Sequence, residues 1–381
     1  MKTIVIGAGI GGLTTALALK QKGLDVDVYE RSPVLTDVGA GISLWPNALK
    51  ALYQLGLRPA LDGVSFVSMD GAVRNSDGTV LSRTTADQFI ARLGLPVVVF
   101  HRADLLAVLV DAARDIAIHT GHEARDVEQD AGGVTVRFAN GAGARGDVLI
   151  GADGLRSVVR DRLGVPGALK YSGYTAWRGI APFETAGLMA GETLGSGQRF
   201  GLAPIHGNRV YWYATDNVNE GQREPPIETK TRLMRLFGDW HQPIPELIRS
   251  TAEDTILRND IYDRDPAERW GSGRITLLGD AAHPMTPNLG QGACQAIEDA
   301  LVLSHLLSTG PDVPSSLRRY ESERIPRTRS IVNASRRVGA LFQVDSRAFC
   351  WLRNLGLRMM PVEMTYRSLK DLGGYEGHLN R

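Results

Sequence analysis

Cysteine is scarce in this sequence, with only two among 381 residues. Cys294 and Cys350 lie far apart and show no metal-ligand spacing, so we predict neither a metal site nor a disulfide framework. This usage favours a reducing compartment, and we expect a cytoplasmic location.

Long apolar runs and tracts of one charge are also missing. No stretch of about 18 apolar residues occurs, which predicts no transmembrane segment. The first strand begins at Thr3 with no charged-then-apolar leader before it, which predicts no signal peptide. The 43 Lys and Arg residues nearly balance 42 Asp and Glu and are spread along the chain, so we expect no nucleic-acid partner.

The first fifteen residues hold the clearest motif that is present. A short apolar strand runs into Gly7, Gly9 and Gly12 before a helix expected over residues 10–21. Gly7 permits a tight turn, Gly9 lets the backbone approach a pyrophosphate, and Gly12 allows close packing of helix and strand. Glu30 closes the next strand, where a ribose hydroxyl needs an acceptor, and an acidic residue there favours FAD or NAD over NADP.

Two further motifs follow buried strands. Asp153-Gly154 precedes Arg156 and Ser157, and Gly279-Asp280-Ala-Ala-His283-Pro284 continues to Gly290-Gln291-Gly292. A carboxylate at position 280 can accept hydrogen bonds from cofactor hydroxyls, or it can cap the following turn. His283 is interpreted as fixing this loop rather than as a catalytic base.

Together the three motifs resemble those of the group A (single-component) FAD-dependent aromatic monooxygenases. Within that group the chain looks most like the bacterial FAD-dependent urate hydroxylases and the salicylate-hydroxylase-like proteins, through Val38-Gly-Ala-Gly-Ile-Ser-Leu-Trp-Pro-Asn47, His101-Arg102-Ala-Asp-Leu105 and Gly279-Asp280-Ala-Ala-His283. The resemblance covers roughly residues 1–340.

The resemblance and the strand and helix patterns together predict an α/β fold. We expect a Rossmann-type, para-hydroxybenzoate-hydroxylase-like (GR2-type) FAD-binding domain, formed by residues 1–70, 97–168 and 270–340. An inserted antiparallel β-sheet domain that binds substrate is expected over residues 71–96 and 169–269. Residues 341–381 form a C-terminal helical segment, in which Trp351, Leu352 and Leu355 are expected to pack against the protein, with a membrane-surface helix as the alternative.

The resemblance also implies cofactor contacts. Arg102 would reach the FAD phosphates, although an exposed ion pair is the alternative. The remaining implied contacts are Arg31, Ser43, Ala124 and the helix start at Gly290, Gln291, Gly292, Ala293 and Cys294, whose free amides would face the flavin. Asp153 is linked in the family to both FAD and NAD(P)H, but it can equally hold its turn. With one dinucleotide fold, NADH or NADPH would bind only transiently as the reductant.

For the substrate, the resemblance points to Arg199 and Tyr211, which match an arginine and a tyrosine that hold an anionic heterocycle in urate hydroxylases. A structural salt bridge is the alternative for Arg199. Trp177, Trp212 and Tyr213 either line an aromatic pocket or belong to the core.

The expected function is that of a FAD-dependent, NAD(P)H-consuming monooxygenase. It would insert one oxygen atom from O2 into a small aromatic or heteroaromatic substrate through a flavin C4a-hydroperoxide. An epoxidase or drug-inactivating hydroxylase of the same family, or a flavin-binding protein without turnover, remain as alternatives. We expect a monomer or a homodimer.

Overall fold

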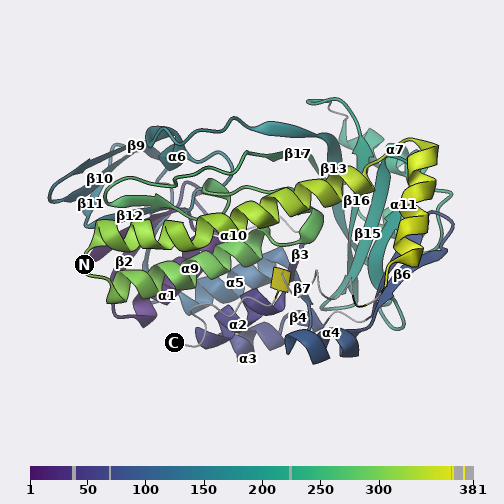
Figure 1. Ribbon diagram of the computed structural model, residues 1–381, viewed down its shortest axis with the longest axis horizontal. Helices are drawn as coiled ribbons and strands as arrows, with labels where there is room; N and C mark the ends of the chain where they lie inside the picture. Colours follow the sequence, from purple (N-terminus) through teal and green to yellow (C-terminus); the bar gives the residue numbers. More distant parts are fainter. Residues whose placement is uncertain (37–39, 68–69, 223–224, 362, 364–371, 374–381) are drawn as a thin grey trace.

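We analysed a computed structural model of the chain, which describes residues 1–36, 40–67, 70–222, 225–361, 363 and 372–373. Val38 and Gly39 of the motif quoted above, and residues 362, 364–371 and 374–381 of the expected C-terminal segment, lie outside this range. The described chain forms two lobes that are bridged along one side by the long helix α10 (Figure 1).

The first lobe is built on a five-stranded parallel sheet in the order β18-β12-β1-β2-β8. Its strands are β1 (Lys2–Ile6), β2 (Asp25–Tyr29), β8 (Ala117–His119), β12 (Val148–Gly151) and β18 (Ile275–Leu277). Ile4 and Val5 of β1 and Leu149 and Ile150 of β12 are fully buried, because helices and further strands cover both faces of the sheet at these central strands. The predicted parallel α/β fold is confirmed.

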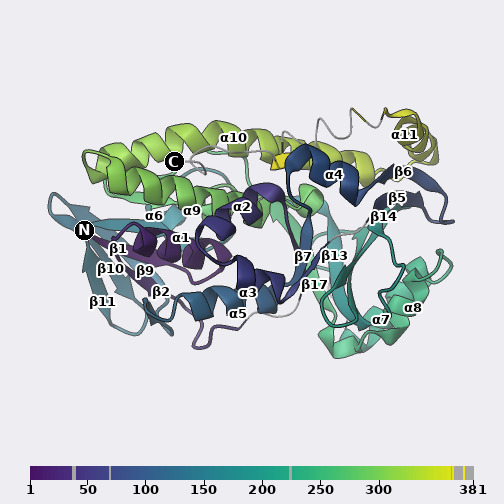
Figure 2. The same ribbon diagram turned by 90° about the horizontal axis from the view of Figure 1, so that it is seen from below.

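The helices of this lobe pack beside the sheet (Figure 2). Helix α1 (Ile10–Gln21) contacts α5 (Arg102–Ala112) and α9 (Gly292–Thr309), and α9 also contacts α2 (Pro46–Gln54) and α10 (Val313–Phe342). Short helices are α3 (Arg58–Asp62) and α6 (Val158–Arg162). Two small sheets complete the lobe: β9 (Ala124–Asp130), β10 (Gly133–Phe138) and β11 (Gly143–Gly146); and β3 (Gly41–Leu44), β7 (Val98–His101) and β4 (Ser65–Val67).

The second lobe is a seven-stranded sheet in the order β17-β13-β16-β15-β14-β5-β6. Its strands are β5 (Gly71–Asn75), β6 (Val80–Thr84), β13 (Lys170–Pro182), β14 (Ala190–Leu194), β15 (Gln198–Ile205), β16 (Arg209–Asn217) and β17 (Leu257–Asp263). The sheet is antiparallel except where β14 pairs in parallel with β5. Strands from residues 71–84 and 170–263 therefore share one sheet.

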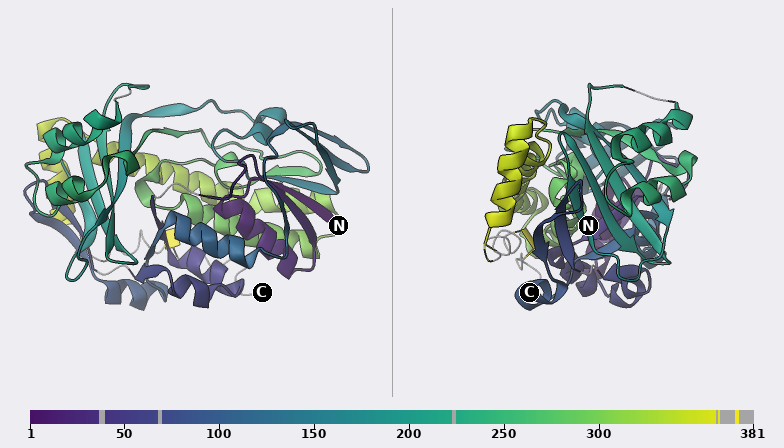
Figure 3. Two further views of the ribbon diagram at one scale, coloured as in Figure 1. Left: turned by 180° about the vertical axis from the view of Figure 1, so that it is seen from behind. Right: turned by 90° about the vertical axis from the view of Figure 1, so that its right-hand side faces the viewer.

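One face of this sheet is covered by two helices, and the other faces the first lobe (Figure 3). Helices α7 (Pro226–Phe237) and α8 (Ile244–Ser250) pack on Trp177, Phe200 and Trp212 to form a separate core. Helix α4 (Ala86–Leu93) lies beyond β6 in the chain.

The expectation for the C-terminal helix was wrong in one respect. Helix α11 (Arg347–Met359) exposes Trp351 by 64%, Leu352 by 52% and Leu355 by 39%, while Arg353 is buried. The guanidinium of Arg353 donates to the backbone oxygens of Phe342 at 3.2 Å and Gly195 at 3.1 Å. These two acceptors hold the polar side of the helix inward and leave its apolar side outward.

Candidate active site

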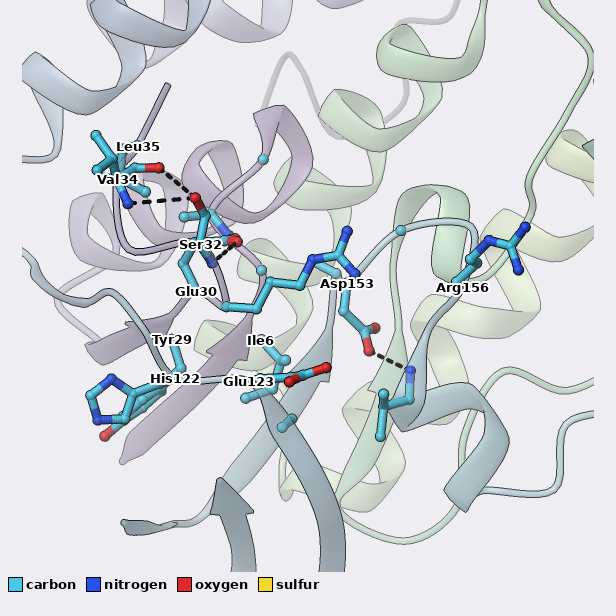
Figure 4. A pocket seen from close by; sticks show the side chains of 18 of the residues that line it. Ile6, Tyr29, Glu30, Ser32, Val34, Leu35, His122, Glu123, Asp153 and Arg156 are labelled. Atoms are coloured by element: carbon cyan, nitrogen blue, oxygen red, sulfur yellow. Dashed lines mark hydrogen bonds between the residues drawn. The ribbon is translucent and has the colours of Figure 1, made fainter. Parts of the chain in front are cut away.

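A pocket of about 350 Å³ opens at the carboxyl end of β1, above the start of α1 (Figure 4). Gly7 has a φ of +105°, which only glycine adopts readily, and a Cβ at Gly12 would overlap the carbonyl oxygen of Gly7. A Cβ at Gly9 would meet no protein atom within 4 Å. Helix α1 has no side-chain cap and no acidic residue in its first turn, so its amides and positive end are left for an anion.

Glu30 lies on the floor of this pocket. Its carboxylate accepts from the backbone N–H of Ala8 at 2.8 Å and from that of Ser32 at 2.8 Å. Each oxygen takes one of these bonds and keeps lone-pair capacity for a ligand hydroxyl, because a carboxylate oxygen accepts two hydrogen bonds. Arg31 and Ala124, predicted from the resemblance, also line the pocket.

Asp153 stands across the pocket, and Figure 4 shows it turned toward the chain that follows it. It accepts from Ser157 Oγ at 2.5 Å and from the amides of Val158 at 2.7 Å and Val159 at 3.2 Å. Burial raises the pKa of this carboxyl, and these hydrogen bonds oppose the rise. The structure thus gives Asp153 a turn-holding role at the start of α6 while leaving it on the pocket wall.

A second cavity of about 800 Å³ lies between the two lobes. Its walls come from β3, the loop before α9 and the uncovered face of the seven-stranded sheet. Arg102 lines both this cavity and the first pocket, so the two spaces meet at its side chain. Asp280 projects into the cavity beside this junction. The loss of hydrating water raises the pKa of its carboxyl, and His283 and Arg102 oppose that rise.

The start of α9 forms part of the cavity wall. Gly290 has a φ of +61°, and a Cβ there would lie 2.8 Å from Ser43 Oγ. Helix α9 has no side-chain cap and no acidic residue in its first turn. Of the predicted residues, Ser43, Gly290, Gly292 and Ala293 line the cavity, whereas Gln291 and Cys294 are buried behind it. Burial raises the pKa of the Cys294 thiol to about 12, so it remains protonated.

Arg199 reaches the cavity from β15, but its polar atoms already have protein partners. Its Nη1 lies 3.1 Å from Glu192 Oε1, its Nη2 donates to Asn288 Oδ1 at 2.8 Å, and its Nε donates to Gln343 Oε1 at 2.5 Å. Burial lowers the pKa of Arg199, but Glu192 and the nearby tyrosine hydroxyls outweigh it and raise the pKa overall. The structure therefore contains the salt bridge that was the alternative to substrate contact.

Tyr211 and Tyr213 alternate with Trp212 along β16 and face the cavity. Burial raises the pKa of both tyrosines, so both hydroxyls stay protonated and can donate hydrogen bonds near neutral pH. Trp177 and Trp212 lie on the opposite face in the core under α7 and α8, which agrees with the core alternative for these two residues and not with the aromatic pocket.

A buried ionic cluster links the loop before α9 to α9 and α10. His283 Nε2 lies 2.6 Å from Asp299 Oδ2, and Arg324 contacts Asp299 at 2.6 Å and Glu298 at 2.5 Å. His283 is 3% exposed and is not among the residues lining the cavity. This placement agrees with a loop-fixing role. Among the described residues, no group of three His, Cys, Asp or Glu could hold a metal ion.

The pocket and the cavity, which share Arg102 as a lining residue, together fit FAD. The open space at Gly9, the uncapped start of α1 and the Glu30 carboxylate suit a pyrophosphate and a ribose. The cavity beyond Arg102, with Asp280 and the uncapped start of α9, suits a polyhydroxylated chain and an electron-accepting ring.

Comparison with known proteins defines the class. Residues 1–335 match the model of the FAD binding domain family, and the chain belongs to this family. Its curated relatives are FAD-dependent monooxygenases, and the chain is an oxidoreductase of this kind.

Particular relatives span nearly the whole chain. Aurachin C monooxygenase/isomerase of Stigmatella aurantiaca is 40% identical over 365 residues, which cover 95% of each chain. FAD-dependent urate hydroxylase of Klebsiella pneumoniae is 37% identical over 343 residues, covering 88% of this chain and 89% of the relative. The crystal structure of Klebsiella pneumoniae HpxO complexed with FAD and uric acid has a TM-score of 0.93 at 34% identity, covering 99% and 98% of the two chains.

Several cavity residues were missed by sequence reasoning. Glu192, Asn288 and Arg178 all line the cavity. The only sequence signal was strand alternation: Arg178 follows Trp177, so the two must face opposite sides of the sheet.

Among the described residues, no helix has the length and apolar character needed to cross a bilayer.

Proposed function

We propose that this monooxygenase uses NADH or NADPH and O2 to add one oxygen atom to an aromatic or heteroaromatic ring held in the cavity between the lobes. The observation that carries this proposal is that Arg102 lines both the first pocket and the cavity, so the two spaces are neighbours. One FAD molecule could extend through both spaces and place its reactive ring opposite the sheet.

The residues that would hold FAD follow from this arrangement. Gly7, Gly9 and Gly12 with Glu30 would hold the adenosine and pyrophosphate end, together with Arg31 and Ala124. Arg102 would pair with the phosphates, and Asp280 would accept from hydroxyls of the chain beyond them. Bound FAD supplies the activation of oxygen, a chemistry that no side chain can perform.

The protein's contribution is positioning, electrostatics and exclusion of water. The uncapped start of α9 places a positive dipole end on the cavity wall, where it would stabilise negative charge on a bound cofactor ring. Apolar side chains such as Phe89, Val97 and Val99 also line the cavity. Protonated Tyr211 and Tyr213 can donate hydrogen bonds to a ring oxygen or nitrogen of the substrate, and no side-chain nucleophile is needed.

The cavity size supports a ring substrate. About 800 Å³ lies at the upper end of the range for small-molecule sites and leaves room for a cofactor ring and a mono- or bicyclic substrate. Relatives named for urate and for 3-amino-4-hydroxybenzoate support the same substrate class. Epoxidation is the second candidate, because zeaxanthin epoxidase of Solanum lycopersicum is 38% identical over 389 aligned residues and the cavity has an apolar side.

The test follows cofactor oxidation in the purified holoprotein. NADH and NADPH oxidation and peroxide release would be recorded with urate, salicylate, aminohydroxybenzoates and bicyclic phenols. We expect one compound to stimulate oxidation with little peroxide and to gain one oxygen atom by mass spectrometry. The absence of NAD(P)H-dependent oxygen uptake with every compound would contradict the proposal.

A further inference from the structure

Arg178 lies on the cavity face of β13, in the middle of the seven-stranded sheet. Its neighbour Trp177 points into the core under α7 and α8, so the alternation of the strand directs Arg178 to the other side, where it lines the cavity. Across the sheet it pairs in register with Tyr213 on β16 and Leu257 on β17.

The polar contacts of Arg178 are few. Its Nη1 donates to the Oδ1 of Asn259 at 3.0 Å, and Asn259 is neutral. A guanidinium carries five N–H donors, so most of its hydrogen-bonding capacity remains. Tyr211 lies on the same face of β16, two residues from Tyr213, the register partner of Arg178. Burial raises the pKa of Tyr211, and the positive charge of Arg178 opposes that rise.

The other charges of the cavity are compensated. Arg199 is paired with Glu192, and Asp280 faces Arg102 and His283. Within the described part of the chain, no carboxylate lies at ion-pair distance from Arg178. Its exposure is intermediate, because one side meets the cavity and the other meets the sheet. Arg178 is thus the cation on the sheet wall whose charge the protein leaves unbalanced.

We propose that Arg178 is a specificity-determining residue that binds an oxyanion on the substrate ring, a phenolate or a carboxylate, beside the hydroxyl of Tyr211. This inference rests on the proposed function and assigns to Arg178 the anion contact that the resemblance assigned to Arg199. Paired Arg199 holds the sheet to the first lobe, and Arg178 with its free N–H groups recognises the anion.

The experiment measures binding without turnover. Holoprotein is titrated with benzoate, with 4-nitrophenol at a pH where it is ionised, and with neutral benzamide, and the perturbation of the flavin spectrum gives each Kd. Ionised and neutral 4-nitrophenol absorb at different wavelengths, so the bound form is read directly. A preference for benzoate identifies a carboxylate, and a preference for 4-nitrophenolate identifies a phenolate.

Three variants complete the design. Arg178→Gln keeps a donor for Asn259 and removes the charge, and we expect it to weaken binding of the preferred oxyanion by about 10- to 100-fold and of benzamide by less than about 2-fold. Arg178→Lys keeps the charge and is expected to retain part of the affinity. Arg258→Gln removes an arginine of the same sheet that stacks near Trp177 on the opposite face, and it should leave all three Kd values unchanged.

The contradicting results are equally distinct. Equal weakening of charged and neutral probes by Arg178→Gln, or no weakening, would overturn the assignment, as would a wild-type holoprotein that binds neither oxyanion better than benzamide. If Arg178→Gln loses FAD or melts early, the Arg178→Lys titration decides the outcome. None of these results depends on oxygen uptake, so the failure of the inference and the failure of the proposed function are separable.

Discussion

The ring of Tyr211 lies directly against the backbone of Gly41, although the two residues belong to different lobes. A Cβ at Gly41 would lie 2.7 Å from the Cβ of Tyr211 and would overlap its ring. Gly41 is on β3, and Tyr211 faces the cavity from β16. The glycine thus sets how closely the sheet approaches the FAD-binding lobe.

Gly41→Ala should therefore displace the Tyr211 ring. We expect KM for the accepted substrate to rise by about 10-fold or more, because a small shift of a positioning group is costly. Steady-state kinetics measures the effect. In a Tyr211→Gly background, which removes the Cβ as well as the ring, the added methyl group has room, so the further effect of Gly41→Ala should nearly vanish. Additive effects in the double variant would contradict this contact.

Alanine substitutions at two glycines of the first pocket should affect different properties, the stability of the fold and the affinity for FAD. A Cβ at Gly12 overlaps the oxygen of Gly7, so Gly12→Ala should destabilise the fold itself. Gly9 has a φ of −75° and no protein atom within 4 Å of a Cβ, so Gly9→Ala should fold normally and lose FAD affinity. Thermal unfolding of the apoprotein and FAD titration separate the two. Equal melting temperatures for both variants would contradict the packing argument.

Arg199 should be important for stability. Arg199→Met removes the partner of Glu192 and the links to Gln343 and Asn288, and we expect a loss of about 3 kcal/mol in the free energy of unfolding. Urea unfolding of the apoprotein measures it. The double variant Glu192→Gln with Arg199→Met should recover part of the loss, because no unpaired carboxylate remains. A variant of full stability but weakened substrate binding would instead restore Arg199 to substrate recognition.

At pH values above about 4, the ionised carboxylate of Asp299 should stabilise the folded protein. Burial raises its pKa, but His283 and Arg324 outweigh burial and lower it to about 2 from an ordinary 3.8. A carboxyl whose pKa is depressed by folding stabilises the fold above the unfolded pKa, and that contribution is lost as pH falls from about 4 toward 2. The shift corresponds to about 2 kcal/mol.

The matching variant is Asp299→Asn. Its free energy of unfolding should be lower than that of the wild type near pH 7, and the difference should shrink as pH falls below about 4. Urea unfolding followed by tryptophan fluorescence over a pH series measures both curves. Parallel curves would show that Asp299 does not titrate with the expected shift.

The backbone features of the site were predictable because their requirements are local. The turn at Gly7 and the start of α1 depend on residues a few positions apart. Side-chain directions depend on partners that are distant in the sequence, so they were harder to predict. Arg353 is turned inward by oxygens of Phe342 and Gly195, one of them far away in the chain, and no pattern within α11 contains that information.

Strand alternation gave only relative directions. It separates Trp212 from Tyr211 and Tyr213, but it does not say which set faces the cavity, since α7 and α8 decide that by covering the other face. The roles of individual cofactor and substrate residues remain predictions for the same reason, because they depend on bound molecules. The sequence does not separate Arg178 from Arg199; the two differ in the structure because Arg199 is paired with Glu192.

The order of the strands has a consequence for how the protein is made. The sheet of the FAD-binding lobe is closed by β18 (Ile275–Leu277), and its cofactor wall is finished by α9, which begins at Gly292. Gly292 follows Gly7 by 285 positions, so on the ribosome the glycine-rich turn is exposed for at least about 14 seconds before α9 is made, at about 5–20 residues per second. Capture of FAD must then be a late event in biosynthesis, and premature termination before α9 should leave a chain that cannot retain the cofactor.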